Sequence, residues 1–71
     1  YTATDEFNSL HGLRTISVDA GTGSVVLACR HGVGNWIDVE TFSADTVKTL
    51  DFGISRVYRF TVTGDATYAI G

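Results

Sequence analysis

RVYRFTVTGDATYAI, residues 56–70, contains the pattern that decides the fold class of this chain. Two runs rich in β-branched and aromatic residues flank the turn sequence TGDA at 63–66. Such runs, bounded by Gly and Asp, are typical of strands joined by a turn. In the first run Tyr58 and Phe60 alternate with Arg59, which predicts one buried face and one face towards solvent. The stretch therefore predicts an antiparallel hairpin that completes a sheet.

The same pattern continues towards the N-terminus as far as Leu13. Clusters of Gly, Asp, Asn and Ser separate short apolar runs. Strands are predicted at 13–18, 24–30, 36–42, 46–51, 55–62 and 67–70. The segment 43–52 also fits a capped helix, but its two threonines and the glycine that follows favour a strand. The fold class is predicted to be all-β, a small antiparallel β-sandwich or barrel of about six strands.

Two of these strands carry the clearest information on burial. Both faces of the strand at 24–30 are apolar, which predicts a central position in a sheet. The strand at 36–42 has one face predicted to lie in the core and one predicted to be wet. The core face is formed by Ile37, Val39 and Thr41. The wet face is formed by Trp36, Asp38, Glu40 and Phe42.

Residues 1–12 show neither a helical nor a two-residue period. We expect an extended N-terminal arm here, followed by a single β-domain at 13–71. A frayed terminus is the alternative, although Tyr1, Phe7 and Leu10 supply apolar side chains for such an arm to bury. Position 1 is not methionine, so we expect processing or a preceding segment.

Size and composition narrow the classes of function. A chain of 71 residues has room for one domain with a thin core, and one cysteine excludes an internal disulfide. The absence of proline, a residue that blunts sheet edges, favours edges covered by a partner. A formal charge of −3 argues against nucleic acid as a partner. No apolar run approaches the length of a membrane span, so no membrane is expected either.

The acidic residues, histidines and cysteine do not match the spacing of a catalytic or metal-binding motif. Asp38 and Glu40 share a predicted solvent-facing strand, and His11 and His31 lack further ligands at zinc-like spacing. Cys29 lies in an apolar run, which favours a small buried core residue. Cys29 and His31 form the one pair of residues that an enzymatic interpretation would use. The sequence therefore predicts a non-enzyme with no catalytic residue, no metal and no cofactor.

Trp36 is the most informative single residue, because it follows a glycine-rich turn and begins a strand. It fits either a core position or an exposed aromatic platform. A platform would serve a protein partner, for which tryptophan is a favoured anchor, or a sugar ring. The alternative function is thus a carbohydrate-binding or adhesion β-module, which could be a domain of a tail or fibre protein. In this alternative Trp36 forms the sugar platform together with Asp38 and Glu40.

The stretch GNWIDVETFSADTVKTLDFGISRVYRFTVTGDATYAI, residues 34–70, resembles the compact β-domains of tailed-phage virion proteins. The similar motifs are WIDV at 36–39, FSAD at 42–45 and VYRFTVTG at 57–64. The resemblance extends over residues 22–70. It is to small head-decoration proteins and other accessory structural proteins of the virion.

This resemblance implies a structural protein that works by contact, located on the capsid surface or in the head–tail region. It implies that the partners are the major capsid protein or other virion proteins. A thin core without disulfides favours a subunit stabilised by neighbours, so a homo-oligomer, a trimer, is expected. The residues predicted to form the interface are Tyr1, Phe7, Leu10, Trp36 and Phe42.

Overall fold

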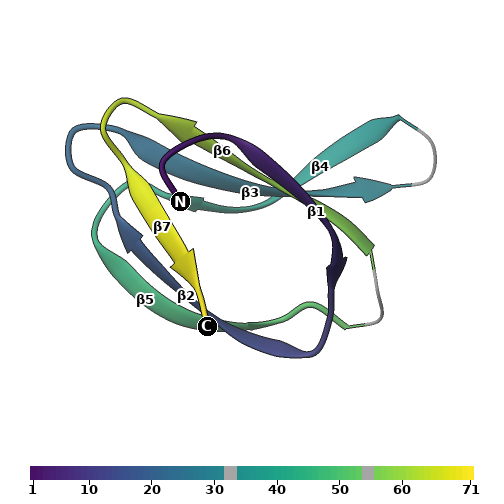
Figure 1. The fold of residues 1–71 in the computed structure, drawn as a ribbon. Helices are drawn as coiled ribbons and strands as arrows, with labels where there is room; N and C mark the ends of the chain where they lie inside the picture. The colour runs from purple at the N-terminus through teal and green to yellow at the C-terminus, as the bar shows by residue number, and fades with distance from the viewer. Residues whose placement is uncertain (32–33, 54–55) are drawn as a thin grey trace.

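Short strands of alternating polarity form two antiparallel sheets that face each other across a single core (Figure 1). The computed structural model describes residues 1–31, 34–53 and 56–71. The strands are β1 (Asp5–Leu10), β2 (Leu13–Asp19), β3 (Ser24–His31), β4 (Asn35–Phe42), β5 (Thr46–Asp51), β6 (Arg56–Thr63) and β7 (Thr67–Ile70). The all-β sandwich predicted from the sequence is confirmed. No helix in these described ranges is long and apolar enough for a membrane span.

The two sheets differ in width. Sheet A has four strands in the order β1-β6-β3-β4, and sheet B has three in the order β5-β2-β7. Strand β3 lies between β6 and β4, which confirms the central position predicted from its two apolar faces. Strand β6 does not adjoin β4, because β3 lies between them.

The core fills the space between the sheets. Its most deeply buried large side chains are Phe60, Ile16, Leu27 and Val25. The rings of Tyr68 and Phe60 stack with centroids 4.6 Å apart, one from each sheet. Aromatic pairs add to the free energy gained from burial, so this stack helps to hold the two sheets together.

The C-terminal strands do not form the paired hairpin that the sequence predicted. The turn at 63–66 carries the chain from sheet A to sheet B, where β7 pairs with β2 and not with β6. The prediction was wrong because a short turn between two strands fits a crossing between sheets as well as a hairpin. Asp65 in this turn accepts hydrogen bonds from the backbone N–H (2.7 Å) and hydroxyl (3.0 Å) of Thr22, which joins it to the β2–β3 turn.

A seventh strand occupies the segment expected to be an extended arm. Strand β1 pairs with β6, with Phe7 opposite Tyr58 and Asp5 opposite Phe60. Ahead of it, Tyr1 exchanges backbone hydrogen bonds with Tyr68 of sheet B. The N-terminal segment thus bridges both sheets of its own chain, and the prediction of a separate arm is corrected. Its pattern was hidden because an edge strand with one covered face needs few apolar residues.

Candidate functional site

A β-bulge in β4 determines which way its side chains point. Glu40 lies opposite Leu27 and Asp38 opposite Ala28, so Val39 is an extra residue between the two pairs. A bulge of this kind breaks the two-residue alternation of a strand. The even-numbered residues before Val39 therefore point to the opposite face of the sheet from the even-numbered residues after it.

The bulge separates two residues that the sequence placed together. Phe42 pairs with Val25 and is 3% exposed, so it belongs to the core and has no surface to offer a partner. Trp36 pairs with Arg30 and lies on the outer face of sheet A. Of the predicted wet face, Trp36 and Asp38 do lie outward, whereas Glu40 and Phe42 lie inward, because simple alternation does not allow for the extra residue.

Trp36 is half-buried on that outer face by two arginines. The guanidinium of Arg59 lies 4.3 Å from the ring centroid, and that of Arg30 lies 5.6 Å away. Contacts of this length between a guanidinium and an indole are favourable cation–π interactions. The residue is thus neither a core tryptophan nor a bare platform.

The sugar-binding arrangement of Trp36, Asp38 and Glu40 does not assemble. Asp38 shares the outer face with Trp36, but Glu40 lies beyond the bulge on the inward side. Glu40 Oε1 accepts a hydrogen bond from Lys48 Nζ of β5 at 2.9 Å, which forms an ion pair between the two sheets. A ring stacked on Trp36 would therefore meet one of the two carboxylates.

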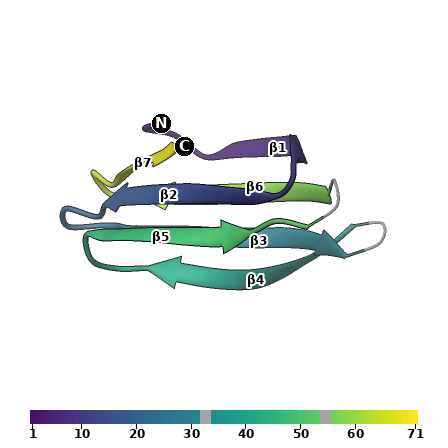
Figure 2. The ribbon, with the colours of Figure 1, turned by 90° about the horizontal axis from the view of Figure 1, so that it is seen from below.

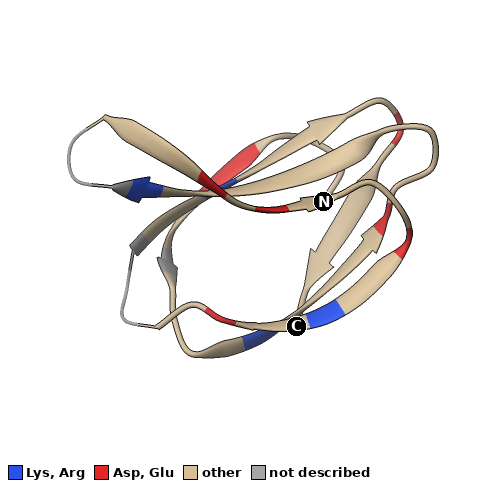
Figure 3. Ribbon diagram, turned by 180° about the vertical axis from the view of Figure 1, so that it is seen from behind, with Lys and Arg blue, Asp and Glu red and all other residues tan. Residues whose placement is uncertain are grey.

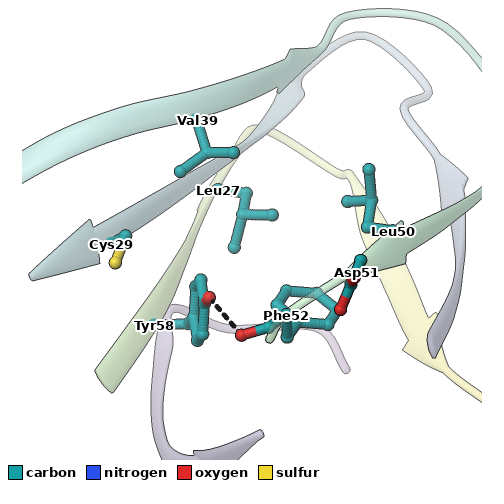
Figure 4. A pocket seen from close by; sticks show the side chains of 7 residues that line it. All are labelled: Leu27, Cys29, Val39, Leu50, Asp51, Phe52 and Tyr58. Carbon is teal, nitrogen blue, oxygen red and sulfur yellow. Dashed lines mark hydrogen bonds between the residues drawn. The ribbon is translucent and has the colours of Figure 1, made fainter. Parts of the chain in front are cut away.

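An apolar recess opens between the sheets beside this ion pair. It has a volume of about 250 Å³. Its lining side chains surround a common space in Figure 4 and are Leu27, Cys29, Val39, Leu50, Asp51, Phe52 and Tyr58. The Tyr58 hydroxyl donates to the Phe52 carbonyl at 2.8 Å, and Asp51 accepts from the Gly53 N–H at 2.8 Å. These polar groups hold the wall in place, and the recess itself suits an apolar side chain.

The recess continues onto exposed apolar side chains of β4. Ile37 is 54% exposed and Val39 is 51% exposed. Both were predicted to lie in the core, and the inward direction is right for Ile37, which pairs with the recess residue Cys29. They are uncovered because the three described strands of sheet B do not reach across β4, which extends beyond β5 in Figure 2. We call Ile37, Val39 and the recess the β4 ledge.

The two sides of the sandwich differ in how they are closed. On one side the N-terminal segment joins β7 to β6 through Tyr1 and β1. On the other side the edges of β4 and β5 are spanned by the ion pair of Glu40 and Lys48. The β4 ledge therefore lies on the open side of the molecule.

The residues predicted as contacts divide between core and surface. Leu10 is 6% exposed and belongs to the core with Phe42, so both predictions are corrected. Phe7 is partly buried and packs its ring edge against Phe60, with centroids 5.7 Å apart. Tyr1 is exposed but stacks on Tyr68. Trp36 retains an accessible part on the surface.

Charged and ligating residues are dispersed over the described chain. Lysine and arginine are found on both sheets, with Arg30 and Arg59 on sheet A and Arg14 and Lys48 on sheet B (Figure 3). Residues 1–31, 34–53 and 56–71 contain no group of three His, Cys, Asp or Glu side chains placed to hold a metal. The proposed pair of Cys29 and His31 depends on the His31 side chain, which lies outside the described part of the structure.

Sequence reasoning missed Ile37 and Val39 as surface residues. Their exposure depends on how many strands the opposite sheet contains, and no local pattern carries that number. Comparisons with protein-family models, with curated proteins and with solved structures found no match.

Proposed function

We propose that this chain is a structural subunit of a tailed-phage virion, on the capsid surface or in the head–tail region, that works by binding a neighbouring subunit. The observation that carries the proposal is the β4 ledge, where apolar side chains are exposed next to an apolar recess. Exposed apolar side chains that adjoin an apolar recess favour contact with another protein. The location in a virion is proposed because residues 22–70 resemble the β-domains of tailed-phage virion proteins.

Energetic considerations support a role as a bound subunit. Covering the half-exposed side chains of Ile37 and Val39 would contribute about 1 kcal/mol each, since full burial of such a side chain contributes about 1.5–3 kcal/mol. A subunit that binds only the assembled shell shifts the equilibrium towards the shell. A small domain repeated many times can therefore stabilise a capsid without any catalytic group.

Particles of the phage that encodes this chain provide the direct test. Mass spectrometry of purified particles should find the chain in a fixed ratio to the major capsid protein. Particles that lack it should disassemble at a lower temperature and should recover when the purified chain is added. The chain's absence from purified particles would overturn the proposal.

A pair of matched variants connects this test to the β4 ledge. Ile37→Lys places a charge on the ledge, whereas Val47→Lys places the same charge on β5 at a residue that is 74% exposed and does not line the recess. The first variant should fail to restore particle stability, and the second should restore it. The reverse result would show that the ledge is not the contact.

A further inference from the structure

Strand β4 ends sheet A with an edge that no described strand covers. The edge is regular from Asn35 to Asp38, before the bulge at Val39. The β3–β4 hairpin reaches past the body of the sandwich in Figure 1, and β4 is the outermost strand of its sheet in Figure 2. An unpaired edge accepts a further strand through main-chain hydrogen bonds.

We infer that a second copy of this chain pairs with β4, antiparallel, across a two-fold axis at Ile37. The inference rests on the proposed function and identifies the neighbouring subunit as the same chain. Two-fold symmetry brings the same surface of both copies together, so the surface must be complementary to itself. The residues of β4 meet that condition in one register.

In this register the inward side of the paired strands is apolar at the axis, with Asn35 of each copy at its two ends. Ile37 of each copy lies opposite Ile37 of the other, and Val39 of each copy lies opposite Asn35. Each exposed Ile37 side chain then covers the other. The β4 ledges of the two copies become one continuous apolar surface.

On the outward side the same register pairs Trp36 of one copy with Asp38 of the other. Arg30 and Arg59 already place their guanidinium groups near the ring of Trp36. The carboxylate of the second copy therefore lies next to the Trp36 ring that carries two positive charges on its other side. Symmetry repeats this arrangement, so two complementary charge clusters form for each pair of copies.

The neighbouring registers lack this complementarity. An axis at Asp38 would place the two Asp38 carboxylates opposite each other, and like charges directly opposite are destabilising. An axis at Trp36 would bring together the arginines of both copies, Arg30 and Arg59 from each. Charge complementarity thus selects the axis at Ile37.

Sedimentation velocity of the purified chain over a range of concentrations tests the inference. The chain should sediment as a dimer at high concentration and dissociate on dilution. Ile37→Lys should remain monomeric, because two lysines would face each other at the axis. Val47→Lys, on β5 of the other sheet, should form dimers like the unchanged chain.

Charge reversal provides a second, independent measurement. Asp38→Arg should weaken the dimer about tenfold or more, because it adds a positive charge beside Arg30 and Arg59 in two places. Adding Arg30→Asp to Asp38→Arg exchanges the charges and should restore much of the affinity. A purely structural role of Asp38 in the monomer would show no such recovery.

The outcomes separate this inference from the proposed function. A chain that is monomeric at every concentration, or a dimer disrupted by Val47→Lys and not by Ile37→Lys, overturns the pairing at β4. A monomer that is nevertheless present in phage particles leaves the proposed function standing with a different neighbour. A β4-paired dimer that is absent from particles confirms the pairing and overturns the virion role.

Discussion

Tyr68 shows how one side chain of the core responds to its surroundings. Its ring stacks between Tyr1 and Phe60, and its hydroxyl is buried without a hydrogen-bond partner among the described residues. Burial, with smaller contributions from Asp5 and Tyr1, raises the pKa of Tyr68 from 10.0 to about 12. The folded chain therefore resists ionisation of this hydroxyl more strongly than the unfolded chain does.

The chain should lose stability at alkaline pH through Tyr68. Between pH 10 and about 12 the unfolded state releases a proton that the folded state retains, so the free energy of unfolding falls as the pH rises through this window. The contribution is fully present below pH 10. Urea unfolding of Tyr68→Phe should show a smaller alkaline decline than the unchanged chain.

The stability of Tyr68→Phe at neutral pH tests the same buried position of the Tyr68 hydroxyl. Because the Tyr68 hydroxyl is buried and unpaired, its removal should leave stability unchanged or raise it. A loss of more than about 1 kcal/mol in Tyr68→Phe would indicate a hydrogen bond and contradict this account.

Gly23 is predicted to be intolerant of any side chain. A Cβ at this position would lie 1.8 Å from the Thr63 carbonyl oxygen, where the β2–β3 and β6–β7 turns meet. Because the obstacle is backbone, Gly23→Ala should lower the free energy of unfolding by about 1–3 kcal/mol or more. Gly71→Ala is the control, since its Cβ would meet ordinary contacts at 3.5 Å or more. Equal denaturation midpoints for both variants would rule out this contact.

Strands β1 and β4 are the two edge strands of sheet A, and they are held to sheet B by different contacts. Strand β1 is tied to sheet B through Tyr1, whereas β4 carries a bulge and an ion pair from Glu40 to Lys48. Ion pairs that are partly exposed contribute about 0.2–1 kcal/mol and are weakened by salt. The β1 edge is thus secured more firmly than the β4 edge.

Strand β1 should be necessary for the fold of the isolated chain. Deleting residues 1–10 removes the buried Leu10 and uncovers Phe60 and the β6 edge, so the free energy of unfolding should fall by more than about 3 kcal/mol. Chemical denaturation monitored by Trp36 fluorescence would measure the loss. Glu6→Gln, on the outer face of β1, should change it by less than about 0.5 kcal/mol. A deletion variant as stable as the full chain would fit a separate arm and not β1.

The complete chain combines a thin core with one open side. A domain of this size buries about 60% of the surface of its unfolded form, so its stability is marginal on its own. Pairing at β4 would add apolar burial where the core is least covered, at Ile37 and Val39. Association and stability should therefore be linked.

This linkage predicts a thermal midpoint that depends on concentration. A tenfold rise in concentration adds about 0.7 kcal/mol per chain of a dimer, which should raise the midpoint by about 3–6 °C for a domain of this size. Calorimetry at several concentrations would measure it. Ile37→Lys should have a midpoint independent of concentration. A constant midpoint in the unchanged chain would contradict the link between pairing and stability.

The sequence was sufficient to place most of the strands and to identify β3 as a central strand. Turn residues and the two-residue alternation are local properties, so they can be read without knowing which strands are neighbours. The buried alternation of Tyr58 and Phe60 was predicted in the same way and is confirmed. The all-β fold therefore followed from nearest-neighbour patterns.

Contacts between strands decided the features that the local patterns did not predict. The bulge at Val39 turns Trp36 and Phe42 to opposite faces, and Ile37 is exposed because the described strands of sheet B do not cover it. Pairing with β6 converts an apparent arm into β1. Each of these features depends on contacts between residues far apart in the chain, whose energies no short stretch of sequence contains.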